Sequence, residues 1–172
     1  MSQSKTENTN ARESWWRRWF VAPVLAQLTQ GISPERLAWT ISLGMVVGVF
    51  PIMGSTTLVC FLIGYALRLN QPVMHVFKTA VYPLHLALIL VFIHLGQSLF
   101  NVPPLSFSIP ELLSQFKADP LQFAKDFGLA AVHGVVAWAL LAPFAVFLIK
   151  LSILPMLTRL SHSLQSKKEV LP

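Results

Sequence analysis

Polar side chains that could do chemistry are few in this chain of 172 residues, and they stand in or beside its apolar segments. Ser55, Thr56 and Thr57 are three consecutive hydroxyl residues inside an otherwise apolar stretch. If a helix begins there, its free amides and the positive end of its dipole lie beside the hydroxyls, an arrangement that can hold an anion such as phosphate. The alternative is that the hydroxyls only cap the helix and satisfy its backbone away from water.

Lys78, Tyr82 and His85 form a second group, because spacings of four and three residues place them on one helical face. Lys78 is the only Lys or Arg between Arg68 and Lys117, and an ionisable group near membrane depth is a candidate functional residue. Lys78 and His85 therefore join the three hydroxyl residues as candidate ligand-binding residues. The alternative for Lys78 is that its stem is buried while its ammonium group reaches the lipid headgroups.

Patterns typical of enzymes and metal sites are missing from the sequence. It contains no HExxH, no CxxC, no paired carboxylates and no Gly-rich phosphate loop, and no acid lies inside an expected span. His85 and His94 are about half a helical turn out of phase, so they do not make a two-ligand metal face. They and His133 are expected to be hydrogen-bonded packing residues. We expect no metal, no cofactor and no enzymatic activity; an enzyme using Lys78 or a histidine would lack a paired acid or base.

The composition indicates an all-α integral membrane protein. Hydrophobic residues make up 54% of the chain and charged residues 12%, with a mean hydropathy of +0.60, which is too apolar for a soluble fold. The net charge of +6 is concentrated in the tails and one short loop. This pattern favours anionic lipid headgroups as partners and argues against nucleic acid.

The elements that would position the candidate residues start from 37–67, a run of 31 residues without a charged side chain. One straight helix of that length would measure roughly 47 Å, more than the ~30 Å hydrocarbon core. Pro51 and Gly54 predict a break, and Ser55 is a good N-cap for the helix that follows. We therefore predict half-helices at about 37–50 and 56–67 that form a re-entrant hairpin. The alternative is one long, tilted span kinked at Pro51.

Gly44 and Gly48 lie four residues apart on the first half-helix. This small-xxx-small spacing lets helix backbones approach closely in lipid. The two glycines could pack inside the protein, or they could face outward toward a partner membrane protein or a second copy of the chain.

The remaining segments follow from prolines, charges and apolar runs. We expect a turn at Asn70 and Pro72 and a kink or helix end at Pro83. The predicted organisation is a disordered tail (1–13), an interfacial segment rich in Trp and Arg (14–32), a membrane domain (33–149) with hairpin 37–67, span 73–100, external loop 101–128 and span 129–149, and a basic cytoplasmic tail (150–172).

Positive charges favour the hairpin over a single span. Lys and Arg number five before the hairpin, two in 68–78, two in 101–128 and four after residue 149, and the 101–128 loop also carries three acids. Cytoplasmic loops carry the excess of Lys and Arg. A re-entrant hairpin followed by two spans places the N-terminal tail, the 68–78 loop and the C-terminal tail in the cytoplasm and the 101–128 loop outside, so every segment obeys this rule. Three spans would instead place the basic C-terminal tail outside. Both termini are therefore expected on the cytoplasmic side of the membrane.

Three groups of residues carry a family resemblance over about 30–100. They are Ser33-Pro34-x-x-Leu37-Ala38, Gly44-x-x-x-Gly48-x-x-Pro51-x-x-Gly54 and Leu67-Arg68-Leu69-Asn70-x-Pro72. Together they resemble the bacterial membrane family DUF2062. In place of that family's usual Asn-Pro-x-Thr motif stands Tyr82-Pro83-Leu84-His85. The resemblance implies a small bacterial inner-membrane protein, and it supplies no activity and no catalytic residues.

From the residues themselves we expect a non-enzymatic membrane component that binds or moves an anionic lipid or a lipid-linked intermediate. Its headgroup site would be the helix start at residues 55–57. The alternative function is a structural or assembly subunit that packs on a partner membrane protein through its glycine face.

Overall fold

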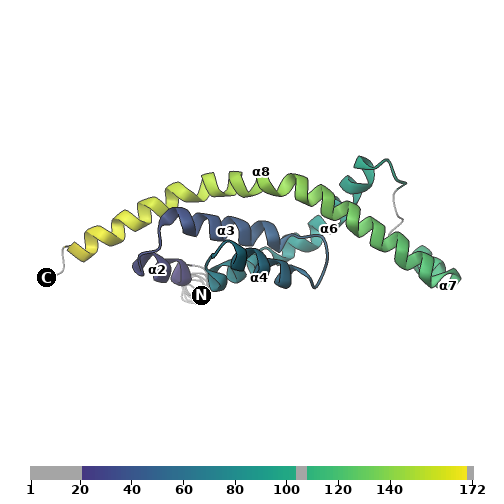
Figure 1. Cartoon of the computed structure of the whole chain (residues 1–172), viewed down its shortest axis with the longest axis horizontal. Coiled ribbons are helices and arrows are strands. Elements are labelled where there is room, and N and C mark those ends of the chain that lie inside the picture. The colour runs from purple at the N-terminus through teal and green to yellow at the C-terminus, as the bar shows by residue number, and fades with distance from the viewer. Residues whose placement is uncertain (1–20, 104–107, 170–172) are drawn as a thin grey trace, which may run out of the picture.

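A computed structural model describes residues 21–103 and 108–169, so the expected disordered tail and the first part of the interfacial segment lie outside the described residues. Within those ranges the chain is all-helical, as the sequence predicts. Its helices, shown in Figure 1, are α2 (Ala22–Thr29), α3 (Pro34–Gly48), α4 (Thr56–Ala66), α5 (Gln71–Ala80), α6 (Tyr82–Leu99), α7 (Ile109–Ala118) and α8 (Pro120–Glu169).

Helix α3 is the centre of the fold. It packs against α8 on one side and against α5 and α4 on another, while α8 arches along the whole molecule (Figure 1). Leu37, Ala38 and Ile41 of α3 are buried in a core that also contains Val24 of α2 and Leu157 of α8. The most buried helix is thus the first half of the uncharged run.

The chain breaks where Pro51 and Gly54 predict it. Helix α3 ends at Gly48, α4 begins at Thr56, and Gly54 has a φ of +84°, which glycine adopts without strain. Ser55, however, does not act as the predicted N-cap. Its own backbone is already helical, and its hydroxyl donates to the Ile52 carbonyl at 2.9 Å instead of accepting from an amide of α4.

The two ends of the uncharged run meet. Nη2 of Arg36 donates to the backbone carbonyl of Arg68 at 2.6 Å. Near these ends, the Ser33 hydroxyl accepts from the Arg36 amide and the Asn70 side chain accepts from the Val73 amide, so both residues are N-caps, of α3 and α5. The chain therefore reverses direction between α3 and α4.

Gly44 and Gly48 pack inside the protein. A Cβ atom at Gly44 would lie 2.6 Å from the Met74 carbonyl oxygen, and one at Gly48 would lie 2.8 Å from the Lys78 carbonyl oxygen. Both glycines thus allow the backbones of α3 and α5 to touch. The prediction that they could instead face a partner is wrong, because α5 covers them.

The expected span 73–100 is divided in two. Helix α5 ends at Ala80, α6 begins at Tyr82, and Val81 between them leaves the regular helix with φ −89° and ψ 6°. Pro83 in the first turn of α6 explains the break, since proline lacks an amide hydrogen and its ring clashes with the carbonyl four residues back, so α5 cannot continue unchanged through it. The long apolar helix is consequently Tyr82–Leu99.

Helix α8 crosses three of the expected segments. It begins at Pro120, inside the expected external loop, and runs for 50 residues through the expected span 129–149 and into the basic tail. The Asp119 carboxylate starts it by accepting from the Leu121 and Gln122 amides. The helix continues past Pro143 and Pro155, where each proline removes one hydrogen bond of the ladder.

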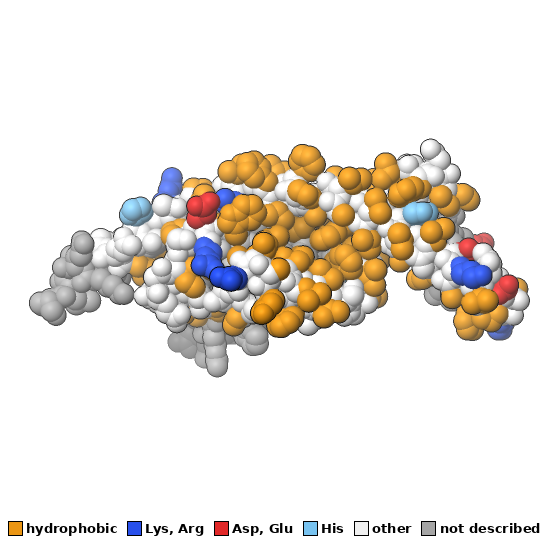
Figure 2. All heavy atoms as spheres, in the orientation of Figure 1, with side chains coloured by type: hydrophobic (Ala, Val, Ile, Leu, Met, Phe, Trp, Pro, Cys, Tyr) orange, Lys and Arg blue, Asp and Glu red, His pale blue; other side chains and the backbone are white. Residues whose placement is uncertain are grey.

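Two of the described helices are long and apolar enough to cross a membrane, α6 and residues 120–166 of α8. In each, 28% of the most apolar 18-residue window is buried inside the protein, so most of the window is half-buried or exposed. Figure 2 shows hydrophobic side chains over the middle of the molecule and charged ones toward its two ends.

Candidate functional site

The structure brings together two of the candidate residues on different helices. Nζ of Lys78, near the end of α5, donates to Oγ1 of Thr57, in the first turn of α4, at 2.7 Å. The pair is accessible, since Thr57 is exposed and Lys78 half-buried. A cation and a hydroxyl thus stand at the start of α4, which is also the positive end of that helix dipole.

The positive charge at this place is not neutralised by an acid. Among the described residues the structure has one ion pair, between Lys150 and Glu35, and it lies at the other end of α3. An ammonium group and a helix N-terminus have the same sign, so their juxtaposition leaves an excess of positive charge. A small anion would neutralise it.

His85 is buried and packs against a neighbouring aromatic ring. Its side chain is 1% exposed and stacks on Tyr82 with ring centroids 5.8 Å apart. The imidazole lies within hydrogen-bonding reach of the Gly48 backbone, while its Nδ1 has no hydrogen-bond partner among the described residues. No described hydrogen bond joins His85 to Lys78 or Thr57, although Gly48 also contacts the backbone of Lys78.

The tertiary contacts of α8 were not predicted from the sequence. Nε1 of Trp138 donates to the Val46 carbonyl at 3.1 Å, and its ring packs edge-on against Phe50. Further along, a Cβ atom at Gly96 of α6 would clash with the backbone of His133 and Gly134. These contacts fix α3 and α6 on α8, and no local pattern in the sequence pairs these residues.

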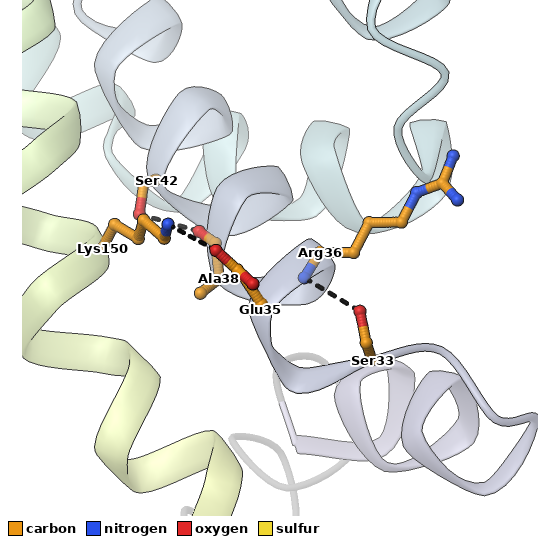
Figure 3. Close-up of polar contacts among 6 residues, drawn as sticks. All are labelled: Ser33, Glu35, Arg36, Ala38, Ser42 and Lys150. Carbon is orange, nitrogen blue, oxygen red and sulfur yellow. Dashed lines mark hydrogen bonds and ion pairs between the residues drawn. The ribbon is translucent and has the colours of Figure 1, made fainter.

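The other end of α3 is held by charge, as Figure 3 shows. Nζ of Lys150 lies 2.8 Å from Oε1 of Glu35, the ion pair drawn in Figure 3. The same Nζ lies 4.4 Å from the centroid of the Trp39 ring. The hydrogen bond and the charge of Lys150 hold the pKa of Glu35 below its ordinary value. The pair joins the first turn of α3 to α8.

Within residues 21–103 and 108–169, no group of three His, Cys, Asp or Glu side chains could hold a metal ion. The fold and the site together define a small all-helical protein with two helices that could cross a membrane and one polar pair at an interhelical break.

The chain belongs to the DUF2062 family, described as an uncharacterized protein conserved in bacteria, whose family model matches residues 16–163. The resemblance drawn from residues 30–100 is thereby confirmed. Neither the curated proteins nor the solved structures contain a match to the chain.

Proposed function

We propose that the chain is a multi-pass protein of the bacterial inner membrane, in which α6 and the middle of α8 cross the bilayer. At 1.5 Å per residue, α6 measures roughly 27 Å and α5 before it adds roughly 15 Å, so the crossing segment is 71–99, with the junction at Val81 inside the bilayer. The exposed apolar surface of both helices supports this placement, since water would not favour it. The distribution of Lys and Arg supports cytoplasmic termini, with α2 at the interface.

The same proposal makes α3 and α4 a re-entrant hairpin. Two observations support it. The contact between Arg36 and Arg68 brings the two ends of the run to one side of the molecule. The outer face of α4 is apolar and exposed, with Leu58 at 60% and Tyr65 at 74%, as expected for a helix that faces lipid.

The function we propose is the non-enzymatic binding or movement of an anionic lipid or lipid-linked intermediate. The observation that carries it is the hydrogen bond between Lys78 and Thr57 at the start of α4. In the proposed hairpin this positive site lies at the closed end, within the membrane, where an anion is the stabilising partner. The phosphate of a lipid headgroup has the charge and the acceptors that the ammonium group, the hydroxyls and the helix amides require.

Binding of phosphate-bearing lipids by purified protein in uncharged detergent tests the proposal. Replacement of Ser55, Thr56 and Thr57 by Ala, or Lys78→Met, should weaken binding of phosphatidic acid by about ten-fold or more. Thr79→Ala is the matched control, because the Thr79 hydroxyl donates only to the His75 carbonyl of its own helix. Unchanged binding in both site variants would contradict the proposal.

A further inference from the structure

A polar recess lies at the opposite, open end of the hairpin. It has a volume of about 560 Å³, within the range of roughly 300–1,000 Å³ that is usual for small-molecule sites. Its walls come from the α2–α3 turn, the first turns of α3 and the α4–α5 turn. The lining residues are Gly31, Ile32, Ser33, Arg36, Thr40, Arg68, Leu69 and Asn70.

Two guanidinium groups line this recess, and no acid does. The nearest carboxylate in sequence, Glu35, is bound to Lys150, and Figure 3 shows Arg36 pointing away from both. Among the described residues, neither Arg36 nor Arg68 has an ion-pair partner. Two positive charges thus share one recess without compensation.

The backbone around the recess is already satisfied. Asn70 caps α5 through its oxygen, and its amide nitrogen donates to Gln27 at 2.6 Å, which ties the α4–α5 turn to α2. Arg68 has a φ of 52°, and the amides of Arg68 and Leu69 close the end of α4 by donating to the carbonyls of Tyr65 and Gly64. The backbone groups around the recess therefore need no hydrogen bond from either guanidinium group, except the one that Arg36 donates to the Arg68 carbonyl.

Most donors in the recess are unused. A guanidinium group carries five N–H donors, and the described contacts use one donor of Arg36 and none from the side chain of Arg68. The planar forks of two guanidinium groups match the oxygens and the charge of a phosphate group. Their two positive charges also balance the two negative charges of a phosphate dianion.

We propose that the Arg36–Arg68 recess binds a phosphate group, either from a lipid headgroup or from a soluble phosphate. This site goes beyond the function proposed above, since it shares no residue with Thr57 and Lys78 and lies at the other end of α3.

Binding of inorganic phosphate by titration calorimetry, and of phosphatidic acid against phosphatidylcholine in micelles, tests the proposal on the full chain. Saturable binding is expected, and Arg68→Gln should weaken it by about ten-fold and Arg36→Gln with Arg68→Gln by more. Arg68→Gln alone removes no described hydrogen bond, so a loss in that variant is not a folding defect. If both inorganic phosphate and phosphatidic acid bind, a soluble phosphate is enough to occupy the recess. If phosphatidic acid binds and inorganic phosphate does not, the ligand is a lipid headgroup.

Two controls separate the alternatives. Lys117→Gln with Arg159→Gln removes the same charge from exposed positions outside the recess and should leave binding unchanged. Thr57→Val with Lys78→Met removes the site at the start of α4. In that background saturable binding should persist and should still fall on Arg68→Gln, which distinguishes the two sites. The proposal is overturned by absence of saturable binding of both phosphate and phosphatidic acid, by an Arg68→Gln substitution without effect in either background, or by an equal loss in the variant of Lys117 and Arg159.

Discussion

Arg36 holds the backbone carbonyl of Arg68 at 2.6 Å, so residues 32 positions apart close the two ends of the uncharged run. A straight helix would place these residues roughly 48 Å apart. The contact therefore requires the chain to turn back, and Gly54, with its positive φ, lies at the turn. It also joins the start of α3 to the turn that leads into α5.

Substitution of Gly44 tests the packing of α3 on α5. The added methyl group of Gly44→Ala would lie 2.6 Å from the Met74 carbonyl oxygen, and backbone cannot move away as a flexible side chain can. We expect a loss of roughly 1–3 kcal/mol in the free energy of unfolding, measured by denaturant titration in micelles. The matched control is Gly128→Ala in α8, where nothing lies within 4 Å and stability should hold or rise. Equal behaviour of the two variants would mean that α3 and α5 are not in backbone contact.

Substitution of Gly54 tests the turn between α3 and α4 through the backbone conformation alone. Its φ is +84° and a Cβ atom there would meet nothing within 4 Å, so the effect of a substitution comes from strain and not from collision. Gly54→Ala should reduce stability by about 1 kcal/mol, and Gly54→Asn by less, because Asn tolerates left-handed backbone better than Ala. If Ala and Asn are both neutral, the residue does not have this conformation.

The ion pair between Glu35 and Lys150 predicts a pH dependence. Lys150 lowers the pKa of Glu35 in the folded protein below the ordinary value of 4.5. The pair therefore stabilises the fold fully above that value, and the contribution is lost as pH falls through the lower, folded pKa. Thermal unfolding of the wild type and of Glu35→Gln should thus differ at neutral pH and converge in acid. A gap that stays constant, or that widens in acid, would show that the pair does not form; Glu111→Gln in α7 serves as the control.

Trp138 tests the docking of α8 on α3. Trp138→Phe removes the indole donor to the Val46 carbonyl but keeps an aromatic ring beside Phe50. We expect a loss of about 1 kcal/mol of stability, the usual net value of one hydrogen bond. Trp138→Ala should cost about 3–5 kcal/mol, because it also empties the space between the helices. A Phe variant as unstable as the Ala variant would assign the whole effect to the indole donor.

Local patterns predicted the parts of the fold that depend on local chemistry. The break was predicted from Pro51 and Gly54, and the structure has it between the end of α3 at Gly48 and the start of α4 at Thr56. Ser55 failed as a cap because the turn before α4 takes it into helical backbone, and a sequence does not show where such a turn ends. The extension of α8 through Pro143 is also non-local, since packing against α3 and α6 can outweigh the lost hydrogen bond.

The residues of the candidate sites were likewise predicted only in part, because some of their contacts depend on tertiary structure. Spacing placed Lys78 on one face with Tyr82 and His85, but the break at Val81 and the approach of α4 pair it with Thr57 instead. Arg36 and Arg68 were not singled out, although they bracket the uncharged run. A hairpin brings such flanking residues together, so the prediction of the hairpin already contained the signal for the recess.

The central claim is that the hairpin returns to the membrane face from which it starts, and the accessibility of residue 70 tests it most directly. Cys60 is the single cysteine of the sequence, and Cys60→Ala removes it. In that background, single cysteines that replace Asn70 or Pro110 are labelled in intact cells by a membrane-impermeant thiol reagent, and again after permeabilisation. We predict labelling of Pro110→Cys from outside, and labelling of Asn70→Cys only after permeabilisation. Labelling of Asn70→Cys from outside, with Pro110→Cys protected, would contradict the account.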